Sequence, residues 1–160
     1  MTIKVGDKIP SVKVKAVTST GVKDASTDEL FAGKKVVLFA VPGAFTPTCS
    51  AQHLPGFVAK AGELKAKGVD EILCLSVNDA FVMGAWGVDR SVGDAVTLVA
   101  DGSGDFTRAV GLELDATNFG MGVRSQRYAF VAEDGVVTQL AVEAPMKFEV
   151  SSAEAILGLL

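Results

Sequence analysis

The sequence has little cysteine and almost no histidine, which excludes several classes of protein. Its 160 residues include two cysteines and one histidine. Two cysteines cannot build the framework of several disulfides that holds small secreted domains together. A structural zinc site takes four ligands, more than these residues supply without carboxylates, so we expect no metal centre. Cysteine is therefore either part of the core or a reactive group.

Long apolar runs and an excess of positive charge are also missing. The longest apolar stretch, residues 36–41, is far shorter than the about 20 residues that span a membrane, so we expect no membrane association. With 15 basic and 19 acidic residues, the net charge of −4 gives no electrostatic basis for binding nucleic acid. Residues 1–7 lack the features of a signal or transit peptide, so we expect a cytoplasmic location.

The composition is that of an ordinary globular protein. Apolar residues make up 49% of the chain and charged residues 21%. The length is sufficient for one full hydrophobic core and does not require a second. We expect a single domain over residues 1–160.

The first half of the chain predicts an edge hairpin followed by a β-α-β unit. Residues 11–16 alternate apolar and polar side chains, and Gly21 supplies a turn. Ser26 and Glu29 match a capping box that opens a short helix. Residues 36–41 and 72–77 are continuously apolar, as expected for strands buried on both faces. Between them, apolar residues recur at helical spacing: Leu54, Phe57, Val58, Ala61 and Leu64.

The second half predicts further helices and antiparallel strands. We expect helices at 81–86 and 106–110 and a strand at 96–100. Asp134-Gly135 is a hairpin signal between strands at 127–132 and 136–140. Ser151 and Glu154 match a second capping box, which opens a last helix. These elements form a mixed α/β arrangement, with a central sheet flanked by helices.

Residues 42–50 join a buried strand to a helix and include Cys49. Thr46 suits the N-cap and Pro47 the first helical residue, so Cys49 occupies the third helical position. Unpaired N–H groups and the helix dipole favour a thiolate there. Making a free thiol mostly ionised needs roughly 3.4 kcal/mol, whereas a partly buried helix end supplies at most about 2. A nearby cation or hydroxyl donor is therefore required. Pro55 predicts a kink within the same helix.

The segment from Pro42 to Phe57 resembles the active-site signature of the peroxiredoxin family, in the type II, peroxiredoxin-5-like subgroup that includes plant enzymes. The resemblance covers the chain from Val5 onward. It implies a thioredoxin-like fold and the reduction of hydrogen peroxide or alkyl hydroperoxides without a cofactor. The stretches that carry it are residues 42–50, 53–57, 68–72, 76–79, 100–104 and 122–129.

The resemblance also implies an active-site set of Pro42, Thr46, Cys49 and Arg124. Arg124, the first arginine of an Arg-x-x-Arg segment, occupies the family's catalytic position and would supply the missing cation. The Thr46 hydroxyl would donate a hydrogen bond to the thiolate or the peroxide, and Pro42 would shield the sulfur from water. Cys49 would attack the peroxide and become a sulfenic acid.

Three further residues have open roles. Cys74 lies in a predicted strand and is either a core residue or a resolving cysteine, with thioredoxin or glutaredoxin and glutathione as candidate reductants. His53 shares a helix face with Cys49; we favour a supporting hydrogen bond over a general-base role. Arg127 either assists Arg124 or pairs with a carboxylate such as Glu143.

Other interpretations compete with these. A thiol-disulfide exchanger would normally show Cys-x-x-Cys, but the residue three positions after Cys49 is Gln52. A redox-gated binding protein would oxidise Cys49 without turnover. Residues 101–105 superficially resemble a calcium loop, but a turn fits better because the glutamate of that loop is missing. Trp86 and Phe81 are expected in the core or on a dimer surface, since the subgroup often forms homodimers.

Overall fold

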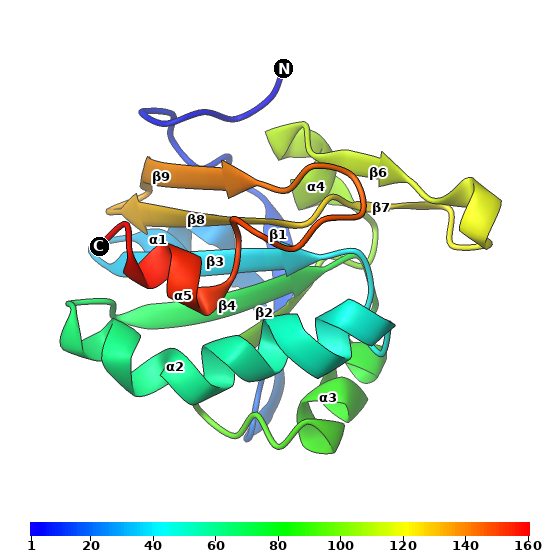
Figure 1. The fold of residues 1–160 in the computed structure, drawn as a ribbon, viewed down its shortest axis with the longest axis horizontal. Coiled ribbons are helices and arrows are strands. Elements are labelled where there is room, and N and C mark those ends of the chain that lie inside the picture. The colour runs from blue at the N-terminus through cyan, green and yellow to red at the C-terminus, as the bar shows by residue number, and fades with distance from the viewer.

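The computed structural model describes residues 1–160 and contains a seven-stranded mixed sheet with helices on both faces (Figure 1). The strands of this sheet are β1 (Lys13–Thr18), β2 (Gly21–Ser26), β3 (Lys35–Val41), β4 (Glu71–Ser76), β5 (Thr97–Ala100), β8 (Tyr128–Glu133) and β9 (Val136–Val142). The helices are α1 (Thr27–Phe31), α2 (Leu54–Ala66), α3 (Ala80–Asp89), α4 (Asp105–Val110) and α5 (Ala153–Leu157). No helix is both long enough and apolar enough to cross a membrane.

The strand order is β2-β1-β5-β4-β3-β8-β9. The central strands β3, β4 and β5 are parallel, and each remaining strand of the sheet is antiparallel to its neighbour. This confirms the edge hairpin, the β-α-β unit and the late hairpin. Asp134 and Gly135 have φ values of 48° and 78°, as the tight turn between β8 and β9 requires.

Two hydrophobic cores lie on opposite faces of the sheet. One packs α2, α3 and α5 against it and contains both cysteines. The other packs α1 and α4 against the opposite face. Alternate residues of the central strands contribute to each core, which explains why residues 36–41 are apolar throughout.

The structure corrects two local expectations. The side chain that caps α5 is Ser152, which accepts from the Ala155 N–H at 3.1 Å, and Ser151 instead donates to Glu143. A small antiparallel pair, β6 (Glu113–Asp115) and β7 (Val123–Ser125), was not predicted because its three-residue strands are too short to show a period. A 3₁₀ turn, η2 (Thr117–Phe119), lies between them. The Ser26 cap of α1 is confirmed.

Candidate active site

The loop after β3 is tied to the loop after the neighbouring strand β4. The Ala44 N–H donates to Asn78 Oδ1 at 3.0 Å, and Ser76 Oγ donates to the same oxygen at 2.6 Å. Because β3 and β4 are parallel, both loops leave the same edge of the sheet. Gly43 suits the crowded loop because a Cβ there would lie 3.1 Å from Thr46 Cγ2. Side chains that follow Pro42 therefore have a rigid base.

Cys49 lies in the first turn of the helix that follows this loop. Helical residues begin at Pro47, and the Ser50 N–H donates to the Thr46 carbonyl at 2.9 Å. Thr46 is therefore the N-cap and Cys49 the third helical residue, as predicted. The Thr46 hydroxyl does not cap the helix, because it accepts no hydrogen bond from a first-turn N–H; it donates to the Gly43 carbonyl at 2.6 Å. It is held in the loop and makes no hydrogen bond with the Cys49 sulfur.

The predicted kink at Pro55 takes the form of a π-helical turn, η1 (Cys49–His53), that runs directly into α2. The Leu54 N–H donates to the Cys49 carbonyl, five residues earlier. Pro55 has no N–H to donate and its ring crowds the carbonyl four residues before it, so a wider turn relieves the conflict. The extra residue in this turn changes the direction in which the first-turn side chains project.

A guanidinium group reaches the sulfur of Cys49. Arg127, directly before β8, donates from Nη2 to Cys49 Sγ at 3.0 Å. Cys49 is fully buried, so solvent screens this contact little. A permanent positive charge beside a sulfur at a helix start favours the thiolate. The expected cation is therefore present, but Arg127 supplies it.

The prediction that Arg124 supplies this cation is wrong in the structure. Arg124, in β7, donates from Nε to the Met121 carbonyl at 2.9 Å and from Nη1 to the Val77 carbonyl at 3.1 Å. Its side chain also packs near Gly43, so it borders the loop without bonding to Cys49.

Strand parity explains the difference between the two arginines. Successive side chains of an extended chain alternate between the two faces of a sheet. In β8, Ala129 belongs to the core that contains Cys49, and Tyr128 belongs to the opposite core. Counting back by two places Arg127 on the Cys49 side, whereas Arg124 lies in β7, a strand of the separate two-stranded sheet, and does not share this alternation. The sequence thus contained a signal that favoured Arg127.

His53 supports the arginine. Arg127 Nη1 donates to His53 Nδ1 at 2.8 Å, and because an arginine cannot accept, His53 must carry its proton on Nε2. Nε2 then donates to the Ser151 carbonyl at 2.9 Å. Burial and the Arg127 charge lower the pKa of His53 to about 3. A neutral ring with both nitrogens engaged is a hydrogen-bonding support and does not serve as a general base near pH 7.

The alternative pairing of Arg127 with Glu143 is not found. The Glu143 carboxylate accepts hydrogen bonds from residues 149–151, and the Arg127 guanidinium forms no salt bridge. Instead the guanidinium carbon lies 5.7 Å from the centre of the Phe148 ring. The positive charge is therefore directed at Cys49 without a carboxylate to neutralise it.

Comparisons with known proteins identify the family of the chain. The Redoxin family model matches residues 4–157. Peroxiredoxin-2B of Arabidopsis thaliana is 53% identical over 159 residues, covering 99% of this chain and 98% of that protein. The chain belongs to the peroxiredoxin family. Peroxiredoxins are thiol peroxidases, so this protein is an oxidoreductase.

This peroxiredoxin also resembles a relative of known structure and a further relative in sequence. Reduced Prx3 from Vibrio vulnificus, in complex with hydrogen peroxide, is 54% identical and superimposes with a TM-score of 0.94, covering 99% of each chain. The chloroplastic Peroxiredoxin-2E of Arabidopsis thaliana is 55% identical, covering 99% of this chain and 69% of that protein. The central mixed sheet with flanking helices is therefore the thioredoxin-like fold of peroxiredoxins.

The second cysteine of this peroxiredoxin is a core residue in the observed conformation. Cys74, in β4, pairs with Phe39 of β3 and Leu98 of β5 and is fully buried. Both cysteines are free thiols in the same core. Burial, reinforced by Cys49 nearby, raises the pKa of the Cys74 thiol. Cys74 is a poor nucleophile unless the surrounding structure opens.

The two aromatic residues of α3 have different environments. Trp86 is fully buried, and its indole Nε1 donates to Ser50 Oγ at 2.9 Å, beside Cys49. Phe81 is 87% exposed at the start of the same helix. Trp86 is thus a core residue that anchors the first turn of the active-site helix, whereas Phe81 is on the surface.

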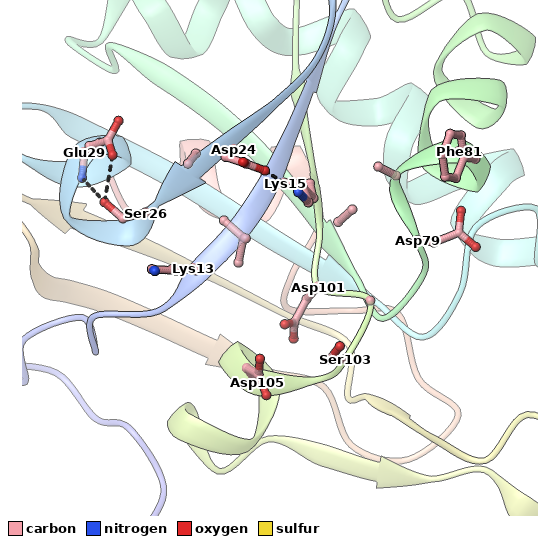
Figure 2. Close-up of a pocket in the computed structure, with 15 residues that line it drawn as sticks. Lys13, Lys15, Asp24, Ser26, Glu29, Asp79, Phe81, Asp101, Ser103 and Asp105 are labelled. Carbon is pink, nitrogen blue, oxygen red and sulfur yellow. Dashed lines mark hydrogen bonds and ion pairs between the residues drawn. The ribbon is translucent and has the colours of Figure 1, made fainter.

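One pocket of this peroxiredoxin lies away from Cys49. This open hollow has a volume of about 610 Å³ and is bordered by β1, β2, the start of α3 and the loop after β5. Figure 2 shows the side chains that line it. Its carboxylates already have partners: Asp24 pairs with Lys15, Asp79 caps α3, and Asp101 accepts from the Phe106 and Thr107 N–H groups. Residues 101–105 thus form the expected turn, and no group of residues is suited to hold a metal ion.

Proposed function

We propose that Cys49 reduces hydrogen peroxide or an alkyl hydroperoxide as a thiolate nucleophile. The observation that carries this proposal is the 3.0 Å hydrogen bond from Arg127 Nη2 to Cys49 Sγ in the first turn of a helix. The helix start and the guanidinium together provide the stabilisation that neither supplies alone. The thiolate is the reactive form of a cysteine, so this arrangement suits a nucleophile.

In the proposed step, the Cys49 sulfur attacks one oxygen of the peroxide and the O–O bond breaks. The sulfur is oxidised to a sulfenic acid, and the second oxygen leaves with the bonding electron pair, takes up a proton and becomes water or an alcohol. Arg127 can stabilise the negative charge as it moves from the sulfur to the leaving oxygen. Thr46 lies in the same loop and would help to position the peroxide.

The sulfenic acid then requires two thiol groups to return to a thiol. A first thiol displaces water and forms a disulfide with Cys49, and a second thiol reduces that disulfide. The burial of Cys74 supports an external first thiol, such as glutathione with glutaredoxin. Resolution by Cys74, followed by thioredoxin, requires local opening of the helix start and of β4.

Replacement of Cys49 by serine tests the proposal. We expect the Cys49→Ser variant to lose turnover of hydrogen peroxide with every reductant, because a serine hydroxyl is not ionised near pH 7. Cys74→Ser is the matched control, since it removes the other thiol. Turnover that survives in Cys49→Ser would end the proposal. Oxidation of wild-type protein that stops after one equivalent despite excess reductant would instead support a redox-gated binding protein.

We also propose that two copies of the chain associate through the surface around Phe81. The hydrogen bond between Ala44 and Asn78 brings the active-site loop, with its half-exposed Phe45, beside the start of α3. Exposed phenyl rings on neighbouring segments, here a loop and the start of a helix, are suited to an interface. Phe81→Asp should shift sedimentation from dimer to monomer, and Val5→Asp, which changes another exposed apolar residue, should not. A wild-type monomer would refute this proposal.

A further inference from the structure

Residues 143–151 form the turn that connects β9 to α5. The Ser151 carbonyl of this turn contacts His53, and its Phe148 ring lies against the Arg127 guanidinium. The proposed mechanism assigns this turn no role. This connection curves round the end of the sheet where the chain enters α2 (Figure 1). Its one buried charged residue is Glu143, which is 7% exposed. A buried carboxylate needs compensation, so its partners indicate what it stabilises.

The Glu143 carboxylate organises the main chain of this turn. Burial alone would raise its pKa, but the hydrogen bonds from Ser151 and the turn N–H groups outweigh burial and hold the pKa of Glu143 below its usual value. The group is therefore an ionised acceptor near pH 7. Its donors are the N–H groups of Glu149 at 2.9 Å, Val150 at 2.9 Å and Ser151 at 2.8 Å, and the Ser151 hydroxyl at 2.7 Å.

The backbone that Glu143 holds is the backbone that contacts the active site. The Ser151 carbonyl accepts the His53 Nε2 proton at 2.9 Å. The Phe148 ring lies 4.9 Å from the His53 ring and 5.7 Å from the Arg127 guanidinium carbon. A fixed turn therefore holds the His53 ring through the Ser151 carbonyl and covers the Arg127 guanidinium with the Phe148 ring.

The His53 ring in turn determines how the guanidinium is oriented. A guanidinium is planar, so the hydrogen bond from Arg127 Nη1 to His53 Nδ1 constrains the direction in which Nη2 points. Nη2 then meets Cys49 Sγ at 3.0 Å. A neutral imidazole orients the arginine and leaves its positive charge in place, whereas a carboxylate in the same position would neutralise that charge.

We propose that Glu143 is a positioning residue for the peroxide reaction. It holds residues 149–151 so that the Ser151 carbonyl orients His53, and His53 directs Arg127 at Cys49. This inference rests on the proposed function, in which the Arg127 guanidinium assists the Cys49 thiolate. A carboxylate is suited to this place because all of its partners donate, whereas an amide would set its own NH₂ group against them.

Glu143→Gln tests the inference, with Glu154→Gln as the matched control. Glu154 is exposed in α5, so the control makes the same chemical change away from the turn. The rate constant for oxidation by hydrogen peroxide is measured by stopped flow through the fluorescence of Trp86, the single tryptophan. We expect Glu143→Gln to lower this rate constant between about 10-fold and about 100-fold, as small misplacements of reacting groups do. The control should stay within about twofold of wild type.

A second measurement separates positioning from general destabilisation. The pH dependence of Cys49 alkylation, in the Cys74→Ser background, should shift to higher pH in Glu143→Gln and not in the control. The ¹⁵N resonances of the single histidine should lose the Nε2-protonated pattern. A folded Glu143→Gln variant with wild-type rate and alkylation profile would overturn the inference. A slower rate that accompanies only a lower Tm, with the alkylation profile unmoved, would also overturn it.

A milder variant keeps the test valid if Glu143→Gln does not fold. Ser151→Ala removes one donor to Glu143 but keeps the carbonyl that His53 uses. We expect a smaller loss in the same direction, and a wild-type rate and alkylation profile would overturn the inference. Cys49→Ser distinguishes the two proposals, because peroxide turnover that survives in that variant would refute the proposed function itself, whereas a wild-type rate in Glu143→Gln would refute only the inference.

Discussion

Replacing Arg127 by alanine removes the only side chain that hydrogen-bonds to Cys49 Sγ, at 3.0 Å. A hydrogen bond to a charged group contributes about 1.5 to 3 kcal/mol. Its loss removes this stabilisation from the Cys49 thiolate, which is the reactive form of the cysteine. The arginine also faces the charge that develops on the leaving oxygen, and loss of one such donor costs about 100-fold or more in rate.

Arg124→Ala is the matched control, since Arg124 lies three residues earlier and bonds to the Met121 and Val77 carbonyls. Stopped-flow oxidation by hydrogen peroxide at several pH values separates the two effects, because raising the pH restores the thiolate but not the lost donor. We expect Arg127→Ala to remain at least about 100-fold slow at high pH. The reasoning is refuted if Arg127→Ala reacts like wild type, or if only Arg124→Ala is slow at unchanged Tm.

Two further predictions concern Cys74 and His53. Cys74→Ser should keep turnover with glutaredoxin and glutathione, because the buried thiol is not needed when an external thiol attacks Cys49. Loss of turnover with that reductant would contradict this prediction. Loss of turnover with thioredoxin alone would make Cys74 the resolving cysteine for the thioredoxin route only. Burial and the Arg127 charge lower the pKa of His53 from its ordinary value of 6.5 to about 3 in the folded protein, so the unfolded chain binds the proton first as the pH falls. The free energy of unfolding should therefore drop by about 1.4 kcal/mol per pH unit below about pH 6.5. His53→Gln should remove this part of the slope in denaturant titrations, and an unchanged slope would refute the assignment.

Most of the sheet could be predicted from the sequence because its signals are local. Strands buried on both faces need apolar residues throughout, which made residues 36–41 and 72–77 recognisable. Asp134-Gly135 encodes its own turn. Thr46-Pro47 placed Cys49 at the third helical position without knowledge of any contact. Most ends of the elements lie within one or two residues of the predictions, whereas α3 ends at Asp89, three residues beyond the predicted end.

The active-site contacts were harder to predict because they join distant segments. The sulfur and its arginine are 78 residues apart, and the choice between Arg124 and Arg127 depends on which face each residue occupies at the entrance to β8. Resemblance to a family signature favoured Arg124, whereas strand parity favours Arg127. The role of Glu143 depends on main-chain N–H groups, which leave no trace in the sequence.

The most direct test of the account is to identify the sulfur that receives the peroxide oxygen. The reduced protein is treated with one equivalent of hydrogen peroxide in the presence of a sulfenic-acid trap, digested, and analysed by mass spectrometry. The account predicts the trapped adduct on the peptide that contains Cys49 and none on the peptide that contains Cys74. An adduct that appears first on Cys74, or peroxide consumption that leaves Cys49 unmodified, would contradict it.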